Sequence, residues 1–460
     1  MNKSPNILLF LTDDHAAWAN HCYGDRYVDT PNIDYLARKG VQMMNAFTPT
    51  PVCSPARACV FTGRTSSQHG VHDYIGTTAD ADVDFNWISG EKILPEILRE
   101  HGYHTAVVGK WHIGQERVAK QGFDHAFTLG PEYPIYHKGN RTFYQGSNPV
   151  ETQGYLSRTI TDASVDYLRQ RDKNSPFFLV VGHYATHSPW NGHPERLVDH
   201  YRQLGVGTEM HREQYPFGIP INEALDVTRA NAPEALCQYY AGVTEIDESV
   251  GRIMDELTAQ NLQDDTLVIY TSDHGLNCGQ HGLFGKGNAT YPLNMLEESI
   301  RVPLIFHFPS RLLNQQKRVD MVDHTDLFAT ILDFAGIEES KDEADRRNSP
   351  GKSLYPLLVN SHHPILKKDI QFCEYGPVRM ARTQRYKLSL YPDPAMNLLF
   401  DLQSDPHEEQ NRFLDPALQA VRDDLTKRID AYYCRYCEES HKGTNFTKLP
   451  TYNPRVAWKS

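Results

Sequence analysis

The amino-acid sequence predicts an α/β fold, in which helices cover both faces of a large mixed, mostly parallel sheet and a smaller antiparallel sheet with a helix follows. Three observations predict this fold. Five short apolar runs have the length and composition of buried strands. Segments with apolar residues at helical spacing lie between these runs. After about Gly336, the chain changes to short strands divided by turn residues.

The elements of the large sheet are expected as alternating strands and helices. The apolar runs expected to be parallel strands span residues 7–11, 105–109, 177–182, 267–271 and 302–306. Helical patterns span residues 93–100, 159–171 and 233–260, and Pro233 suits the start of the last helix. This alternation predicts a sheet with helices on both faces. Residues 197–228 are rich in Gly, Pro and charge, and we expect them to form a long surface insertion.

The C-terminal part of the chain has a different pattern. Residues 341–350 are polar and charged, which is typical of a connector. The expected short strands and the final helix span residues 370–374, 386–391, 398–401 and 416–434. We therefore expect two domains: a large α/β domain over residues 1–340, and a smaller C-terminal subdomain with an antiparallel sheet and a terminal helix over residues 341–460.

The composition indicates a soluble globular protein. Its net charge of −12 argues against a nucleic-acid partner, for which a basic surface is typical. No apolar run approaches the roughly 20 residues that span a bilayer, so no membrane partner is expected. The N-terminus leads directly into a strand pattern, which predicts a cytoplasmic location, or a periplasmic or secreted one if a signal peptide was removed. Eight cysteines in 460 residues do not make a disulfide scaffold, and the oligomeric state is not predicted.

The segment from Cys53 to Arg57 places a thiol beside an expected helix start. Ser54 is a favourable N-cap, and the helix is expected over residues 55–62 with Gly63 as its stop. The helix N-terminus and the charge of Arg57 would attract an anion next to Cys53. These residues alone leave two interpretations open, a reactive thiol and a buried structural cysteine.

Charged and imidazole side chains follow four of the expected strands. They are Asp13 and Asp14 after the first strand, Lys110 and His112 after the second, His183 and His187 after the third, and Asp273 and His274 after the fourth. An Asp after a strand is often only a turn residue or a helix cap. Because ligands of open α/β sheets gather at the carboxyl ends of the strands, agreement among four strands predicts a functional site.

The carboxylates among these residues predict a divalent cation. Asp13, Asp14 and Asp273 supply oxygen ligands, which suit Ca²⁺ or Mg²⁺ better than Zn²⁺. The neighbouring His274 leaves Zn²⁺ and Mn²⁺ as alternatives. Such an ion could polarise a nucleophile and hold an anionic group of a substrate. Three cationic residues would neutralise the remaining charge of that group: Arg57, Lys110 and Lys286.

At these positions the chain resembles the formylglycine-dependent (type I) sulfatases of the alkaline phosphatase superfamily. Residues 53–57 (CSPAR) are similar to the signature whose cysteine is oxidised to formylglycine, and residues 109–114 (GKWHIG) resemble the second signature. Segments at 13–14, 271–275 and 282–286 occur in the family's order, and residues 399–402 resemble part of its small second domain. The resemblance implies an alkaline phosphatase-like fold, a catalytic N-terminal domain and hydrolysis of a sulfate ester.

The resemblance also implies the cofactors. One calcium ion would be bound by Asp13, Asp14, Asp273, His274 and the oxidised Cys53. His274 stands where many family members have an asparagine. A separate maturation enzyme would form formylglycine from Cys53, so this enzyme is an expected partner.

The catalytic roles that the resemblance implies fall on seven residues. Cys53 would supply the hydrate, Arg57 would hold it, Lys110 and Lys286 would bind the sulfate oxygens, His112 would act on the hydrate, Asp273 would help to deprotonate it, and His187 would protonate the leaving alcohol. His183 is the rival of His187, and the spacing of His187 to Pro189 favours His187.

The substrate is expected to be a sulfated carbohydrate, such as a glycosaminoglycan fragment, or another sulfated small molecule. Candidate substrate-binding residues are His72, Asp73, Trp190 and Arg379, with His69, Trp87, His137 and His193 as further ones. Each could be an ordinary loop residue, but the set suits a sugar ring, and Arg379 could bind a uronate carboxylate. Two alternatives remain: a phosphodiesterase or phosphonate monoester hydrolase of the same superfamily, and a non-catalytic, metal-dependent glycan-binding protein.

Overall fold

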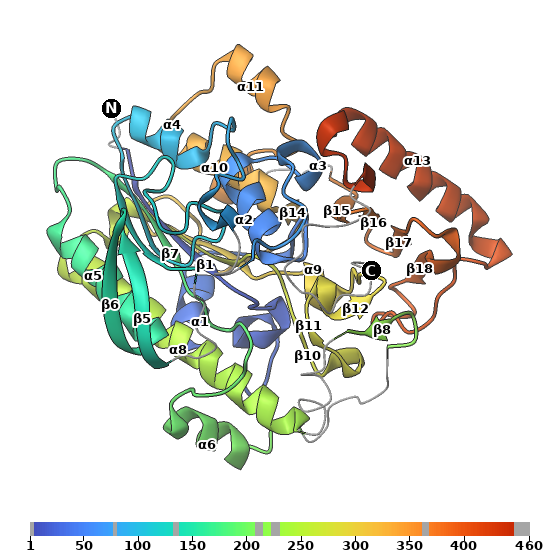
Figure 1. Cartoon of the computed structure of the whole chain (residues 1–460), viewed down its shortest axis with the longest axis horizontal. Helices are drawn as coiled ribbons and strands as arrows, with labels where there is room; N and C mark the ends of the chain where they lie inside the picture. The colour runs from blue at the N-terminus through green and yellow to red at the C-terminus, as the bar shows by residue number, and fades with distance from the viewer. Residues whose placement is uncertain are drawn as a thin grey trace.

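A ten-stranded sheet runs between two layers of helices (Figure 1). The computed structural model describes residues 4–76, 81–131, 138–207, 215–221, 231–360 and 368–445. The strands of the sheet are β1 (Asn6–Thr12), β2 (Val41–Phe47), β3 (His104–Gly109), β4 (His125–Leu129), β5 (Lys138–Gln145), β6 (Asn148–Tyr155), β7 (Phe177–Gly182), β9 (Thr266–Ser272), β13 (Leu304–His307) and β14 (Gln316–Asp323). The helices of the same part are α1 (Pro31–Arg38), α2 (Cys53–Thr62), α3 (Ser66–His69), α4 (Leu94–Glu100), α5 (Leu156–Gln170), α6 (Glu195–Gln203), α8 (Ala232–Ala259), α9 (Glu297–Ile300) and α10 (His324–Ala335).

The strand order of the sheet is β14-β2-β13-β9-β1-β7-β3-β4-β5-β6. The central strands β9, β1, β7, β3 and β4 are parallel neighbours, and β14 is parallel to β2. Strands β5 and β6 form an antiparallel hairpin at one edge. The predicted mixed, mostly parallel sheet is therefore confirmed.

One of the five expected parallel strands was assigned the wrong direction. The apolar run at residues 302–306 forms β13, which is antiparallel to both β9 and β2. An apolar run reports that a strand is buried on both faces and does not report its direction. A parallel connection needs a crossover, usually a long helix, but the one α-helix between β9 and β13 is the four-residue α9.

Alternate residues of the central strands face two hydrophobic cores. On one face, Leu9 and Val180 pack with side chains of α2, α4 and α10. On the other face, Leu8 and Val181 pack with side chains of α1, α5 and α8. Helices α1 and α5 bury an apolar stripe against the sheet, whereas every residue of α2 is buried. Both core layers were expected from the alternation of strands and helices.

A four-stranded antiparallel sheet follows the large one and packs against a long helix. It consists of β15 (Gln371–Tyr375), β16 (Val378–Arg382), β17 (Tyr386–Leu390) and β18 (Leu398–Asp401), with α13 (Gln419–Arg435) across it. Phe372 and Tyr432 stack with ring centroids 4.0 Å apart. The small sheet and its helix are as predicted, except that the pattern did not indicate β16.

The segments expected as a connector and as a surface insertion both begin with helical residues. The expected connector contains α11 (Lys341–Arg347), followed by α12 (Tyr355–Val359), whose Leu357 joins the first core of the large sheet. The expected insertion begins within α6, whose Val198 and Tyr201 are buried. Residues 208–214 and 222–230 of that segment lie outside the described residues. The domain boundary after residue 340 stays a prediction.

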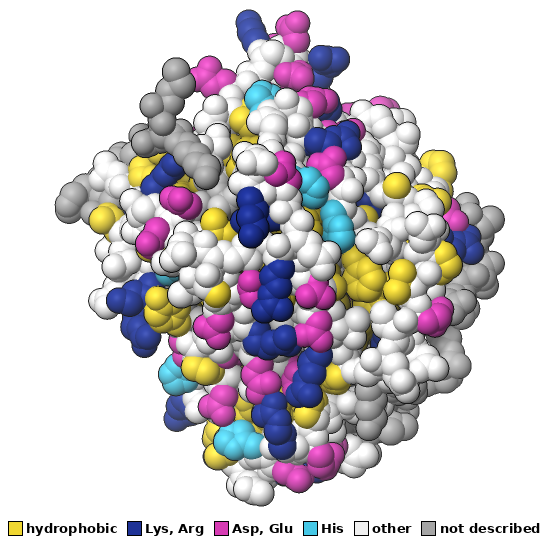
Figure 2. Space-filling view, turned by 90° about the vertical axis from the view of Figure 1, so that its left-hand side faces the viewer, with side chains coloured by type: hydrophobic (Ala, Val, Ile, Leu, Met, Phe, Trp, Pro, Cys, Tyr) yellow, Lys and Arg dark blue, Asp and Glu magenta, His cyan; other side chains and the backbone are white. Residues whose placement is uncertain are grey.

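The charges on one broad face of the molecule are mixed in sign (Figure 2). Basic side chains run down this face with acidic side chains on both sides of them. Ion pairs join the neighbouring helices α5 and α8: Arg252 pairs with Asp162, and Arg169 pairs with Glu256. Within the described part of the chain, no helix is long and apolar enough to cross a membrane.

Candidate active site

Four neighbouring strands, β9, β1, β7 and β3, bring their carboxyl ends to one edge of the sheet. The loops that follow these strands are joined by backbone hydrogen bonds: the Thr186 amide donates to the Asp13 carbonyl at 2.8 Å, and the Asp273 amide donates to the Thr12 carbonyl at 3.1 Å. Asp14 and His112 have positive φ values of 58° and 63°, which are uncommon outside glycine and turn the chain sharply after the strand. The sequence prediction of a cluster at this edge is therefore met.

Cys53 is the first residue of helix α2, and the predicted cap is wrong. The N-cap residue is Val52, which makes no side-chain cap bond, so the helix begins two residues before the predicted start. The hydroxyl of Ser54 instead accepts a hydrogen bond from the Ile75 amide at 2.9 Å. Gly63 ends the helix in the left-handed conformation, as predicted. The thiol therefore stands at the helix N-terminus, where backbone N–H groups favour negative charge.

The Cys53 thiol points into a charged cluster and not into an apolar core. Its Sγ lies 3.3 Å from Asp13 Oδ1, 3.3 Å from His274 Nε2 and 3.0 Å from Lys286 Nζ. Burial raises the pKa of Cys53, but the nearby cations, Lys110 and Lys286 above all, bring it well below its usual value. Of the two interpretations, the surroundings favour the reactive one.

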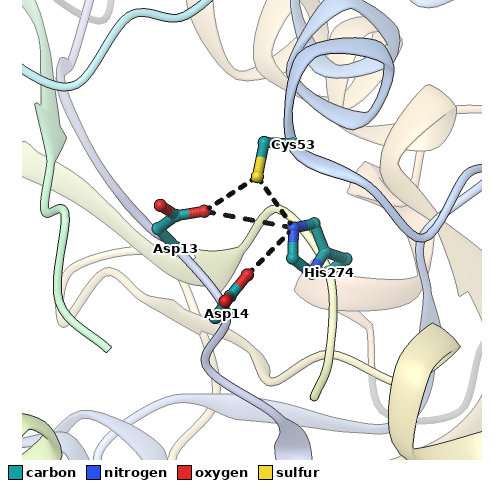
Figure 3. Close-up of side chains that lie close together, drawn as sticks. All are labelled: Asp13, Asp14, Cys53 and His274. Carbon is teal, nitrogen blue, oxygen red and sulfur yellow. Dashed lines mark hydrogen bonds and ion pairs between the residues drawn. The ribbon is translucent and has the colours of Figure 1, made fainter. Parts of the chain in front are cut away.

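Four side chains converge closely enough to hold a metal ion (Figure 3). One ligand atom each from Asp13, Asp14, Cys53 and His274 lies within 4.8 Å of the others, and all four residues are buried. The Nδ1 of His274 is 2.9 Å from the Gly275 carbonyl, which can only accept, so Nε2 is the nitrogen turned toward the carboxylates. Two carboxylates and one imidazole make a donor set that fits a divalent cation.

Asp273 lies beside this cluster of four ligand atoms. Its Oδ1 is 3.4 Å from His274 Nε2, and its Oδ2 accepts a hydrogen bond from Arg57 Nε at 2.8 Å. Arg57 also donates to the Lys110 carbonyl at 3.0 Å and to the Thr12 carbonyl at 3.3 Å. The guanidinium therefore fixes three loops of the site at once.

Two lysines pair with the candidate metal ligands. Lys110 Nζ lies 2.5 Å from Asp13 Oδ2, and Lys286 Nζ lies 2.6 Å from Asp14 Oδ1. Burial raises the pKa of Asp13, but the charge of Lys110, followed by His187 and Lys286, lowers it to about 2. The site thus places carboxylates and ammonium groups in direct contact, an arrangement that suits a cation and an anion bound side by side.

The two predicted catalytic histidines are each oriented by a backbone carbonyl. His187 Nδ1 is 2.6 Å from the Ser188 carbonyl, and His112 Nε2 is 2.8 Å from the Ile75 carbonyl. Since a carbonyl can only accept, these nitrogens carry hydrogen, and proton exchange falls to Nε2 of His187 and Nδ1 of His112. Burial lowers the pKa of His187, but the charges of Asp14 and Asp13 raise it above its usual value, whereas burial and Lys110 lower that of His112 to about 4.

A tyrosine that the sequence reading did not single out supports this arrangement. The ring of Tyr184 stacks on His187 at 4.9 Å between centroids, and Lys110 Nζ lies 5.3 Å from the centre of the Tyr184 ring. The rival histidine, His183, is fully buried and has no hydrogen-bond partner for either ring nitrogen among the described residues. It does not line the cavity described next.

A cavity of about 810 Å³ opens above the cluster. Cys53, Asp14, His112, His187 and Lys286 lie at its charged end. The other lining residues are Tyr74, Ser188, Pro189, Trp190, Asn191, Ile221, Asn231, Glu234, Ala235, Leu276, Phe284, Gly285, Asn288 and Ala289. The volume is in the range of pockets that hold a small-molecule ligand.

Of the predicted substrate-binding residues, Trp190 lines this cavity and three others do not. His72 and Asp73 line a much smaller neighbouring pocket. Arg379 lies with its guanidinium 4.1 Å from the centre of the Tyr433 ring.

The further candidates among the described residues also lie outside this cavity. His69 is buried beside Cys59, with Nε2 3.4 Å from the thiol, and His193 Nδ1 is 2.7 Å from the Tyr155 hydroxyl. Trp87 packs against Phe85. His137 lies outside the described residues.

Several cavity residues gave no signal in the sequence. Tyr74, Asn231, Glu234 and Asn288 reach the cavity from three separate segments, and none of them belongs to a motif. Only the rule that loops after parallel strands carry function could have drawn attention to them, and it does not select individual residues.

Comparison with protein families decides the assignment. A family model described as "Sulfatase" matches residues 5–337, which is most of the chain. The chain belongs to the sulfatase family. The sulfatases are hydrolases of the alkaline phosphatase superfamily, as the resemblance implied. A second model, for the C-terminal part of N-sulphoglucosamine sulphohydrolase, matches residues 279–434.

Individual sulfatases are similar over nearly the whole length. The chain is 27% identical to N-acetylglucosamine-6-O-sulfatase of Bacteroides thetaiotaomicron, covering 89% of this chain and 83% of that protein. A solved structure in complex with its substrate, D-glucosamine-2-N,6-O-disulfate, has a TM-score of 0.81 and 25% identity, covering 94% and 98% of the two chains. A phosphonate monoester hydrolase of Agrobacterium radiobacter shares the fold, with a TM-score of 0.71, 21% identity and coverage of 94% and 96%.

Proposed function

We propose that this sulfatase removes a sulfate ester from a carbohydrate, with formylglycine formed from Cys53 and one calcium ion. One observation carries the proposal: Cys53 Sγ lies within 3.3 Å of a candidate metal ligand, Asp13, and 3.0 Å of the Lys286 ammonium group, at the end of a cavity large enough for a sugar. The names of the similar proteins, which include sulfatases of amino sugars, support a glycan substrate.

The residues present fit both absent groups. The Cys53 side chain is surrounded by charges and not by packed apolar groups, so its conversion to an oxygen-bearing side chain removes no core contact. Asp13, Asp14 and His274 would hold the ion, and Asp273 is close enough to assist. When present, the hydrated formylglycine supplies hydroxyl groups for attack on sulfur and for release of sulfate, while calcium stabilises negative charge.

The cationic residues would bind the sulfate group. Lys110 and Lys286 are buried and lie on two sides of the cluster, so their ammonium groups can each meet a sulfate oxygen. Arg57, anchored by Asp273, would keep the Cys53 side chain in position. Because these cationic side chains are buried, their charges act more strongly on the developing charge than they would in solvent.

The histidines would move protons. His187 donates its Nδ1 hydrogen to the Ser188 carbonyl, so a proton on Nε2 can pass to the leaving alcohol of the sugar. The charges of Asp14 and Asp13 raise the pKa of His187, which favours the protonated form that this step needs. His112 is held neutral, with Nδ1 able to accept a proton from the modified side chain of Cys53.

The proposal is tested by mass and by turnover. Intact-mass measurement of the protein made together with a formylglycine-generating enzyme reports the conversion of Cys53, because the aldehyde is lighter than the thiol. The matured protein is then given amino sugars and uronates with sulfate at defined positions, with the Cys53→Ala protein as control. We expect sulfate release from at least one saccharide. No release from any of them by fully matured protein would overturn the proposal.

A phosphonate monoester hydrolase has a similar fold, so the type of ester that this chain hydrolyses has to be tested as well. Sulfate, phosphate and phosphonate esters with the same leaving group separate the two candidates. We expect kcat/KM to be highest for the sulfate ester. A higher value for a phosphate diester or a phosphonate would favour the alternative function. Tight glycan binding without any ester hydrolysis would favour a non-catalytic relative.

A further inference from the structure

A two-stranded ribbon extends outward from the wall of the cavity. It consists of β8 (Ile219–Pro220) and β12 (Thr290–Tyr291), which pair antiparallel beside the cavity segment 284–289 (Figure 1). Ile219 is directly opposite Tyr291, and Pro220 is opposite Thr290. One step further in, the Ile221 amide donates to the Ala289 carbonyl at 3.2 Å, which continues the pairing toward the cavity.

The same face of this ribbon begins inside the cavity and ends outside it. Ile221 and Ala289 line the cavity. Side chains alternate along a strand, so Ile219 points to the same side as Ile221, whose amide continues the pairing, and Tyr291, directly opposite Ile219, lies on that face as well. Ile219 is 70% exposed and Tyr291 is 40% exposed. The wall of the cavity thus continues onto an exposed isoleucine and tyrosine.

The opposite face anchors the ribbon. Thr290 is buried, and its hydroxyl is held by the Pro292 carbonyl at 2.8 Å and the Asn294 amide at 3.3 Å. Phe217 packs against Phe400 of the small sheet, with centroids 5.6 Å apart. Packing of this opposite face therefore fixes the position of Ile219 and Tyr291 relative to the cavity.

We propose that Ile219 and Tyr291 form a subsite for the sugar ring that is attached to the sulfated ring. This inference rests on the proposed function, because it extends the same site to a longer substrate. Two residues along a strand cover about 6.6 Å, which is close to the length of one sugar ring. An aromatic ring beside an aliphatic side chain offers a flat apolar surface, and the C–H face of a pyranose can stack on it.

The chemistry of the pair favours a neutral ring over a charged one at this position. Neither side chain offers a cation for a carboxylate or a second sulfate, whereas Lys286 lines the charged end of the cavity, with Lys110 and Arg57 buried in the same cluster. The subsite therefore selects for a carbohydrate of at least two units, with the sulfate on the ring that enters the cavity.

Three substrates test the subsite: a sulfated monosaccharide that the enzyme hydrolyses, and two disaccharides in which an unsulfated sugar is attached on either side of it. We expect the unsubstituted enzyme to prefer one disaccharide. Tyr291→Ala should lower kcat/KM for that disaccharide roughly tenfold, mainly through KM, and leave the monosaccharide within about twofold. Ile219→Ser, on the other strand, should give a smaller change of the same kind, and Tyr291→Phe should retain activity.

Tyr35→Ala is the matched control, because Tyr35 is a similarly exposed aromatic residue, 43% exposed, on helix α1. Calorimetric titration of the Cys53→Ala protein with the same disaccharide gives a readout that needs no turnover, and Tyr291→Ala should weaken this binding by the same factor. An equal effect of Tyr291→Ala on monosaccharide and disaccharide, or no effect on either, would overturn the subsite alone. Failure of the unsubstituted matured enzyme to release sulfate from any sugar would instead overturn the proposed function.

Discussion

The floor of the cavity is built mainly from strand ends and a helix start, whereas its outer wall is built from loops and elements of two or three residues. The floor is the buried cluster of Asp13, Asp14, Cys53, Lys110, Asp273, His274 and Lys286, of which Asp14, Cys53 and Lys286 line the cavity. The outer wall consists of Trp190, Ile221, Leu276, Phe284, Asn288 and Ala289. Floor residues are at most 8% exposed and are tied together by ion pairs. Wall residues are mostly apolar or neutral and contact one another through ring edges and backbone bonds, such as Trp190 with Phe284 at 6.0 Å.

This difference separates reaction chemistry from substrate choice. The parallel sheet fixes the floor, because four strands end side by side and their loops are joined by backbone hydrogen bonds. The wall depends on segments that are distant in sequence, so it can change without disturbing the floor. Floor substitutions should therefore affect turnover for every substrate, and wall substitutions should affect some substrates only.

The largest expected effect comes from Cys53→Ala. The substitution removes the side chain that the proposal makes the nucleophile, so kcat should fall by about 10³-fold or more for every sulfate ester. Thermal unfolding should change little, because the thiol packs against charges and not in an apolar core.

Cys59→Ala provides the matched control for this prediction. Cys59 lies in the same helix and is also buried, but burial, with Glu374, raises its pKa well above the usual value. Its loss should leave kcat within a few-fold of the unsubstituted value, measured by sulfate release. Retained turnover in the Cys53→Ala protein would remove Cys53 from the reaction and would make the floor a binding site only.

Most of the floor was predictable from the sequence, for a physical reason. Asp13, Lys110 and Asp273 each follow an apolar strand directly, and neighbouring parallel strands must end at the same edge. This prediction did not require the order of the strands within the sheet to be known. The direction of β13 was not predictable in the same way, since its apolar residues report only burial.

The wall and the helix start were poorly predictable, because distant contacts decide them. His72 and Asp73 follow Cys53 closely in sequence, yet His72 Nε2 lies 2.6 Å from the His441 carbonyl and Asp73 Oδ1 lies 2.5 Å from the Tyr375 hydroxyl. Both side chains are thus engaged by the C-terminal part of the chain and not by the cavity. Ser54 has the right chemistry for an N-cap, but its hydroxyl serves the Ile75 amide instead.

The next largest effect is expected for His187→Gln. If His187 protonates the leaving alcohol, its loss should slow sugar sulfates by about 10²- to 10⁴-fold, while aryl sulfates with acidic phenols as leaving groups should be slowed much less. The measurement is kcat for a series of leaving groups of increasing pKa. If the slope of log kcat against leaving-group pKa is the same in His187→Gln as in the unsubstituted enzyme, His187 does not protonate the leaving alcohol.

His183→Gln is the control for His187. Both histidines follow β7, but His183 does not reach the cavity. If His183→Gln lowers kcat, it should do so by the same factor for all leaving groups. Any such decrease in kcat should be accompanied by a lower Tm.

Removal of the metal should lower stability as well as activity. Burial lowers the pKa of His274, yet the surrounding carboxylates, Asp273 above all, raise it to about 9, which is the electrostatic environment that attracts a cation. A bound ion should therefore stabilise the folded chain by about 2.7 kcal/mol when its free concentration is about 100 times its Kd. The measurement is the Tm with chelator and after addition of Ca²⁺, Mg²⁺, Mn²⁺ or Zn²⁺.

The variant with Asp13→Asn and Asp14→Asn separates metal binding from general stability. Its Tm will be lower from the start, because Lys110 and Lys286 lose their buried partners. The informative quantity is the change in Tm on adding the ion, which should vanish. A Ca²⁺-dependent Tm that persists in this variant would place the ion elsewhere in the molecule.

Trp190→Ala is expected to have the smallest of these effects. It tests the outer wall most directly. Trp190 presents its ring to the cavity and donates from Nε1 to the Thr186 carbonyl at 3.1 Å. Loss of the ring should raise KM for a sulfated sugar roughly tenfold and leave KM for a small aryl sulfate nearly unchanged, with kcat constant for both. Trp190→Phe keeps an aromatic face but loses the hydrogen bond, so it should restore most of the sugar KM. If the Phe variant instead resembles the Ala variant, and both lower kcat, then Trp190 acts by holding the loop of Thr186 and His187, and this part of the wall belongs functionally to the floor.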